Sequence, residues 1–251
     1  MNFNKSSAIL RKAVRIACVQ FASGPHKAAN IDNARSQVAK AASEGAGIVI
    51  LPECFNSPYS TSEFKDYAEV LHPSPPPEDE SPTYHALSNM AREASVYLIG
   101  GSVPELEAGN KITIIDLEDY GKIGLGICFD IRFPEPAAIA ARSGAFFLIY
   151  PSAFNRTTGS LHWELLSRSR ALDNQVYVAM CSQSFEPGSS YPAWGYSMVV
   201  DPSGQIVTSA TRNEAIVYAD LTEETIYNCR KQVPLETSRR FDIYPDVSTQ
   251  T

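Results

Sequence analysis

The sequence predicts an α/β fold in a single domain, and three observations support this prediction. The chain has 251 residues, 44% of them hydrophobic, which is enough for one sizeable core. Uncharged apolar runs, typical of strands buried on both faces, recur at 47–51, 96–101, 145–150 and 176–181. Segments with apolar residues three and four positions apart separate these runs, and such alternation of strand and helix is typical of α/β proteins.

The remaining elements can be placed in order along the chain. Residues 14–20 alternate like a strand, and the helix after them is expected to begin at the capping residue Asn30 and to end at Gly45. The proline-rich acidic stretch 73–82 is expected to form a surface loop. Further helices are expected at 83–94, 161–174 and 223–231, a hairpin at 197–207 with its turn at 201–204, and a strand at 215–221.

Composition excludes several classes of protein. The net charge of −7 and the absence of any basic run argue against nucleic acid and anionic membranes as partners. No apolar run approaches the roughly eighteen residues of a membrane span. The five cysteines are odd in number, widely spaced and without the spacing of a zinc site, which fits a reducing compartment. We expect a cytoplasmic protein, although the basic, serine-containing residues 1–12 leave a mitochondrial location open.

The stretch 120–135 contains the candidate nucleophile. Its apolar residues alternate with glycines up to Ile127, as in a strand, and the alanine-rich residues 137–141 predict a helix. Cys128 falls between the two, where helix-terminal N–H groups favour a thiolate and can hold an oxyanion. Position alone favours a buried structural cysteine, because free cysteines are among the most buried residues.

A candidate base follows the apolar run 47–51. Glu53 emerges at the carboxyl edge of this expected strand, where α/β proteins build their sites. A solvated loop glutamate is the alternative. Cys54 competes with Cys128 as the nucleophile because it follows Glu53 directly, but adjacent residues on an extended segment point to opposite sides.

Several motifs, in their order and joint spacing, resemble the nitrilase superfamily of carbon–nitrogen hydrolases. They are Leu51-Pro52-Glu53, the stretch 121–135 around Cys128, and the stretch 162–175. Details at 151–155, 157–159 and 239–244 resemble its ω-amidase branch. The resemblance implies an N-terminal extension at 1–13 and one carbon–nitrogen hydrolase domain at 14–251, with a family segment missing near 107–109.

For the fold, this resemblance implies a four-layer α-β-β-α sandwich, paired as a homodimer and incomplete in the middle. For the chemistry, it implies a Glu-Lys-Cys catalytic group with no metal and no cofactor. Cys128 would attack the amide carbon and Glu53 would be the general base. A free thiol is mostly protonated at neutral pH, so an adjacent base is useful. The backbone N–H of Phe129 would help to hold the oxyanion.

Structural roles are expected for four neighbouring residues. Asp130 and Glu135 are expected to be local caps, and His162 and Trp163 to be core or a wall of the site.

The same branch implies a small-molecule amide as substrate, with 2-oxoglutaramate and 2-oxosuccinamate as the examples. Arg132 matches the family's carboxylate-binding arginine, and Phe154 and Thr158 would line the same pocket. Arginine suits this role because its fork can bind a carboxylate through two parallel bonds. The alternative is that Arg132 pairs with a nearby acid such as Glu135.

One part of the family pattern is missing. Before the strand that begins at Gly121, family members carry the catalytic lysine in a basic motif and a second active-site glutamate. Here Glu107 runs directly into 108–116, which resembles the segment that normally follows the lost one. Lys111 and Lys122 remain nearby, but neither lies in the motif and neither is given the role. The deletion is expected to reduce activity and to expose apolar sheet edges that favour aggregation.

Two functions of different classes therefore follow from the sequence. The first is an ω-amidase-like hydrolase of linear amides that releases ammonia. The second is a catalytically inactive protein of the same fold that acts only through protein association. A nucleotide- or CoA-binding domain is disfavoured because no Gly-rich phosphate loop is present. Steady release of ammonia would separate the first two.

Overall fold

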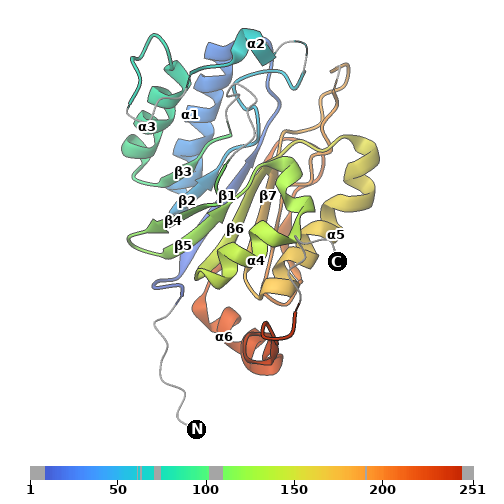
Figure 1. Cartoon of the computed structure of the whole chain (residues 1–251). Coiled ribbons are helices and arrows are strands. Elements are labelled where there is room, and N and C mark those ends of the chain that lie inside the picture. The colour runs from blue at the N-terminus through green and yellow to red at the C-terminus, as the bar shows by residue number, and fades with distance from the viewer. Residues whose placement is uncertain are drawn as a thin grey trace.

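The computed structural model describes residues 9–60, 62, 64–70, 75–101, 110–189 and 191–244, and its strands form two sheets (Figure 1). The first sheet has the order β10-β1-β2-β3, with β1 at Val14–Gln20, β2 at Ile48–Ile50, β3 at Tyr97–Ile99 and β10 at Ala215–Leu221. The second runs from β4 to β9 in sequence order. Its strands are β4 at Thr113–Leu117, β5 at Gly121–Leu125, β6 at Ala145–Ser152, β7 at Tyr177–Ser182, β8 at Met198–Val200 and β9 at Ile206–Ser209. Strands β1, β2 and β3 are mutually parallel, as are β5, β6 and β7.

Helices cover the outer faces of both sheets. The helices of the described chain are α1 at Lys27–Ser43, α2 at Phe64–Tyr67, α3 at Pro82–Ala94, α4 at Pro134–Arg142, α5 at Arg156–Asn174, α6 at Glu223–Gln232 and α7 at Leu235–Ser238, with a 3-10 turn at Cys128–Arg132. In Figure 1, α1 and α3 lie on one side of the molecule and α4 and α5 on the other. No described helix is both long enough and apolar enough to cross a membrane.

Three apolar clusters define four layers. One cluster fills the space between the sheets, with Ile16, Ile50, Phe147, Ile149 and Val199 among its fully buried members. A second packs α1 and α3 onto the four-stranded sheet, and a third packs α4 and α5 onto the six-stranded sheet. The expected α-β-β-α sandwich is therefore confirmed.

Two expected helix starts are wrong. Helix α1 begins at Lys27, and Asn30 lies within it, where its amide bonds the N–H and the C=O of Gly24 and holds the preceding loop. Helix α5 begins at Arg156, five residues before the expected start at Leu161, because Asn155 caps it by accepting from the N–H of Thr158 at 2.8 Å. The expected end of α1 at Gly45 is confirmed by its left-handed backbone, with φ of +87°.

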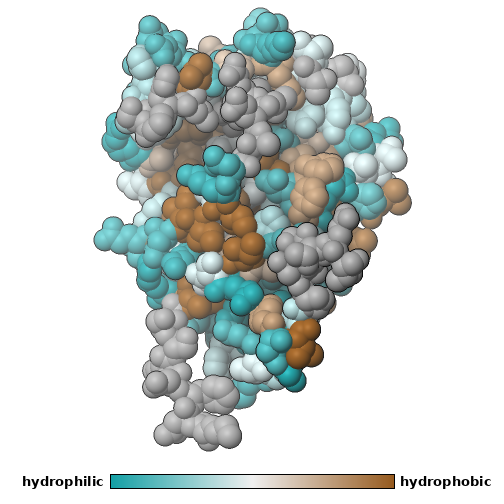
Figure 2. Space-filling view, in the orientation of Figure 1, coloured by the Kyte–Doolittle hydropathy of each residue, from teal (hydrophilic) through white to brown (hydrophobic). Residues whose placement is uncertain are grey.

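The sandwich is uneven at one end. Strand β3 forms the edge of the four-stranded sheet and its side chains are only half-buried, so the expectation of a fully buried strand at 96–101 is wrong. On β4, Ile115 pairs with Ile123 of the inter-sheet core but is 42% exposed. Figure 2 shows hydrophobic side chains gathered in the middle of the face turned to the viewer, over the strands β4 to β6. The join predicted near 107–109 lies outside the described residues.

Candidate active site

Glu53 and Cys128 approach each other from different sheets. Glu53 follows β2 of the four-stranded sheet, and Cys128 follows β5 of the six-stranded sheet. Both residues leave the carboxyl ends of parallel strands, the edge at which α/β sheets build sites. The structure therefore brings together the two residues that the sequence singled out separately.

The backbone around Cys128 forms a tight turn. Cys128 itself has a φ of +43°, which is rare for a residue with a side chain and is tolerated where the surroundings fix it. The carboxylate of Asp130 accepts from the N–H of Ile127 at 2.8 Å, so its expected capping role is confirmed. Gly126 cannot carry a side chain, because a Cβ there would lie 2.6 Å from the Tyr150 ring. These contacts fix the thiol at the mouth of the 3-10 turn.

The carboxyl group of Glu53 is poised between its two protonation states near neutral pH. Burial raises its pKa to about 7, against opposing hydrogen bonds from the Cys128 thiol and the Ala153 N–H. Its Oε2 atom is buried and has no hydrogen-bond partner among the described residues. A carboxyl group in this state can take the proton of a hydrogen-bonded thiol.

Burial raises the pKa of the Cys128 thiol, and the negative charge of Glu53 raises it further, whereas the Ala153 N–H and the Arg132 charge lower it. This direction is opposite to the thiolate-favouring effect that the sequence predicts for a helix end. A thiol in this state needs a base at the moment of attack.

Cys54 lies in a different environment. It sits in a turn with a φ of +54°, not on the extended segment that the sequence predicted. Its side chain is buried against Phe64, with Tyr59 packed on the same cluster, and burial raises the pKa of its thiol. Cys18, Cys181 and Cys229 are also buried, whereas Cys128 is the partly exposed one of the five.

The predicted carboxylate pocket is partly assembled. The guanidinium of Arg132 lies 4.8 Å from the Phe154 ring centroid and 5.2 Å from that of Phe129. Its Nη1 bonds Nδ1 of His162 at 3.1 Å, and no ion pair between Arg132 and Glu135 forms in the described structure. Thr158 instead donates both its N–H and its hydroxyl to Asn155 in the helix cap.

Several residues of the site were missed by the sequence analysis. The N–H of Ala153 reaches both Glu53 and Cys128. Tyr59 and Tyr191 pack with their ring centroids 4.4 Å apart, and the charges of Glu53 and Cys128 contribute to the raised pKa of both phenols. The two tyrosines lie in irregular loops, where no periodicity marks them. Ala153 contributes only backbone, which no side-chain pattern reveals.

No lysine is among the described groups that shift the pKa of Glu53 or Cys128. Lys122 donates to the carbonyl of Ser143 at 3.2 Å, and Lys111 is exposed. Arg132 is the cation that acts on the Cys128 thiol in the described part of the chain. The described residues also form no group of three or more metal-ligating side chains.

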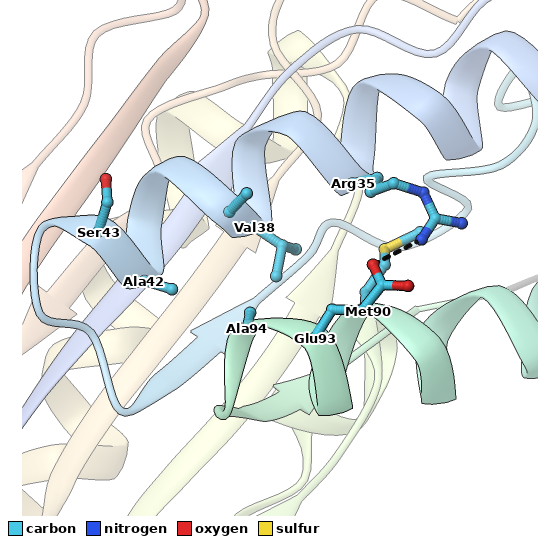
Figure 3. A pocket seen from close by; sticks show the side chains of 8 residues that line it. Arg35, Val38, Ala42, Ser43, Met90, Glu93 and Ala94 are labelled. Atoms are coloured by element: carbon cyan, nitrogen blue, oxygen red, sulfur yellow. Dashed lines mark hydrogen bonds and ion pairs between the residues drawn. The ribbon is translucent and has the colours of Figure 1, made fainter.

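A separate hollow of about 370 Å³ lies between α1 and α3 (Figure 3). The ion pair of Arg35 and Glu93, 3.0 Å long, joins the two helices there, and Val38 and Met90 also line the hollow. No cysteine is among the described residues that line this hollow.

A buried carboxyl group and a thiol thus meet at the carboxyl edges of two stacked sheets in an α/β protein. The carbon-nitrogen hydrolase family model matches residues 15–118 and 104–231, and the chain belongs to this family.

Relatives of known structure and name agree with this assignment. The chain is 42% identical to omega-amidase NIT3 of Saccharomyces cerevisiae over an alignment of 292 residues, covering 97% of this chain and 99% of that protein. It is 41% identical to omega-amidase NIT2 of Mus musculus, covering 92% and 96%. The crystal structure of S. cerevisiae Nit3, described as a member of branch 10 of the nitrilase superfamily, superposes with a TM-score of 0.88 over 94% of this chain and 100% of that chain, at 42% identity.

Proposed function

We propose that the site hydrolyses linear amides through a thioester on Cys128. The carboxylate of Glu53 takes the thiol proton as sulfur attacks the amide carbon, and that proton then goes to the departing nitrogen, which leaves as ammonia. Glu53 next takes a proton from water, whose oxygen displaces the sulfur and releases the acid, and Glu53 then returns that proton to the departing thiolate. The N–H of Phe129, in the first turn of the 3-10 segment where amides have no intrahelical acceptor, holds the oxyanion.

One observation carries this proposal. Glu53, a buried carboxyl group with a pKa of about 7, lies beside Cys128, a thiol that cannot ionise without help. A base with a pKa near neutral pH can both accept and return a proton, which the two halves of the reaction need.

The substrate that we propose is an amide with a carboxylate at its far end, such as 2-oxoglutaramate or 2-oxosuccinamate. The names of the omega-amidase relatives motivate this choice. The proximity of Arg132 to Cys128 supports it, because the guanidinium is close enough to lower the pKa of that thiol. Phe154, which packs on Arg132, would line the pocket, whereas Thr158 is occupied by the cap of α5.

We further propose that this chain hydrolyses amides slowly, because a segment with a cationic residue is missing between β3 and β4. The 292-residue alignment is longer than the 251-residue chain, so positions of the relative have no counterpart here. The unpartnered Oε2 of Glu53 and the uncovered Ile115 support a gap at this place. Loss of one oxyanion donor costs roughly a hundredfold or more in rate.

The second candidate, an inactive protein that acts through association, has support from the outer face of α5. Leu161, Leu165 and Leu172 on this face are each at least half exposed, and they line a shallow hollow of about 490 Å³ with Ser203 and Gly204. A second copy of the chain is the occupant that we propose for this face, which makes the protein a homodimer. The net charge of −7 supports a cytoplasmic protein without nucleic-acid or membrane partners.

Ammonia release from 2-oxoglutaramate tests the two candidates. An amidase gives ammonia that disappears in Cys128→Ala but persists in Cys54→Ala. Light scattering on the same samples gives the mass of the particle, and Leu165→Glu should convert a dimer to monomers. Absence of ammonia from a soluble dimer would favour association without catalysis.

A further inference from the structure

We propose that His162 is a positioning residue that presents one particular edge of the Arg132 guanidinium to the substrate carboxylate. This inference rests on the proposed carboxylate role of Arg132. It adds that the specificity of the site also depends on helix α5. In the described hydrogen bonds, α5 contacts neither Cys128 nor Glu53.

The chemistry of the contact fixes the state of the imidazole. An arginine has only donors, so Nδ1 of His162 must accept the bond from Nη1 at 3.1 Å. Nδ1 is therefore unprotonated, and in the neutral ring the proton lies on Nε2. Protonated imidazole could not make this bond and would place two cations side by side.

Helix α5 holds the backbone of Arg132 as well as its side chain. The buried Arg170 donates from Nε to the carbonyl of Ile131 and from Nη2 to the carbonyl of Arg132, both at 2.9 Å. Arg170 and His162 lie eight residues apart on the same helix, close to two turns. One rigid helix, α5, therefore holds both the backbone and the side chain of Arg132.

The aromatic rings complete the orientation. Phe154, which is buried, and Phe129, which is exposed, both lie within cation–π range of the Arg132 guanidinium. These contacts limit movement of the plane, and the bond to His162 fixes rotation within it. One hydrogen-bonding edge of the guanidinium is consequently left for a ligand.

That edge consists of Nε and Nη2. Nη1 is occupied by His162, whereas Nε of Arg132 is buried and has no hydrogen-bond partner among the described residues. A buried donor without a partner is costly, and an acceptor supplied by a ligand removes that cost. A carboxylate placed side-on would accept from Nε and Nη2 together, which is the bidentate geometry that arginine favours.

The test uses covalent labelling of Cys128, which needs no turnover. We would compare 5-iodopentanoate with 5-iodopentanamide, which have the same length and differ in the charge at the far end. The preference is the ratio of the two rate constants, with the labelled cysteine identified by peptide mass. The variants are Arg132→Ala, His162→Phe, which keeps a ring without an acceptor, and His162→Asn, whose Oδ1 can replace Nδ1.

The expected result is that the preference for the charged reagent falls about tenfold in Arg132→Ala and in His162→Phe, and is retained in His162→Asn. The rate with the neutral reagent should stay within about twofold in the His162 variants, since Cys128, Glu53 and Arg132 are untouched. In Arg132→Ala the neutral rate should fall as well, because the charge that lowers the pKa of the Cys128 thiol is lost, so this variant is judged by the ratio of the two rates. If His162→Phe lowers the neutral rate as well, His162→Leu serves as the second variant without an acceptor.

The outcomes separate this inference from the proposed function. Loss of preference in Arg132→Ala together with full preference in both acceptor-free His162 variants overturns the positioning role alone. Full preference in Arg132→Ala contradicts the carboxylate role on which the inference rests. Equal losses in His162→Asn and His162→Phe also overturn the positioning role, because the acceptor would then be irrelevant.

Discussion

The carboxyl group of Glu53 and the thiol of Cys128 lie close enough for each to shift the pKa of the other, although the two residues follow strands of different sheets. The dyad therefore exists only when the two sheets are stacked. Its geometry depends on the inter-sheet core that contains Ile50 and Phe147, which are fully buried. Damage to that core should separate the base from the nucleophile before the secondary structure is lost.

The first prediction concerns which cysteine reacts. A substrate-like electrophile should label Cys128, because its thiol is partly exposed and bonded to a base, and should spare Cys54, which is buried behind Tyr59 and Phe64. Peptide mass analysis of the folded protein gives the site directly. Cys54→Ser is the matched control and should label like the parent chain. Preferential labelling of Cys54 would show that the assignment of the nucleophile is wrong.

The second prediction concerns stability against pH. The folded pKa of Glu53, about 7, lies above the ordinary value of 4.5, so the folded state holds a proton that the unfolded state has released. This contribution to stability is fully present below pH 4.5 and is lost as the pH rises to about 7. The loss is on the order of 3 kcal/mol at pH 8.

Glu53→Gln removes this titration and should be more stable than the parent at pH 8 but not at pH 4.5, as urea unfolding at the two pH values can show. Asp116→Asn is a control on an exposed carboxyl group, whose pKa is lowered by Arg11, so it should not produce the same crossover. A constant difference between the parent and Glu53→Gln across this range would contradict the raised pKa.

The third prediction concerns substrate recognition by Arg132. Arg132→Ala should raise KM for 2-oxoglutaramate at least tenfold more than KM for butyramide, because only the first substrate carries a carboxylate. Arg132→Lys should recover part of the loss, since it restores the charge but not the fork. Steady-state ammonia release with both substrates measures the split. Equal losses on the two amides would exclude the carboxylate role.

The fourth prediction concerns Gly159, where alanine should destabilise the protein although it usually stabilises a helix. Alanine is normally better than glycine within a helix by about 1 kcal/mol. At Gly159 of α5, however, an added Cβ would lie 2.3 Å from Cγ of Trp194, whose own N–H is bonded to the carbonyl of Phe154. Gly159→Ala should therefore lower the free energy of unfolding, whereas Ser160→Ala at the neighbouring exposed position should not. A thermal shift of the same sign in both variants would contradict the close packing.

Much of the fold could be predicted because its strands and helices follow from local patterns of apolar residues. The apolar runs at 145–150 and 176–181 became β6 and β7, both buried throughout. Helix boundaries were less accurate where polar side chains decide them. The first turn of α5 is polar and contains Gly159, so apolar periodicity does not reveal it, although Asn155 was available as a capping signal.

The site was predictable residue by residue but not as an arrangement. Glu53 and Cys128 could each be placed at the end of a strand, whereas their contact depends on how two sheets stack, which local patterns do not specify. The raised pKa of Cys128 was missed for the same reason, because burial is a property of the assembled layers. The bond between His162 and Arg132 joins residues thirty positions apart through the packing of α5 on the 3-10 turn.

Ammonia release from 2-oxoglutaramate by these 251 residues, beside omega-amidase NIT3 of S. cerevisiae in the same assay, tests the central claim most directly. The account predicts a turnover at least about a hundredfold below that of the relative, because a cationic oxyanion donor is missing, with the residual activity abolished by Cys128→Ala. Turnover equal to that of the relative, or ammonia release that persists in Cys128→Ala, would contradict it.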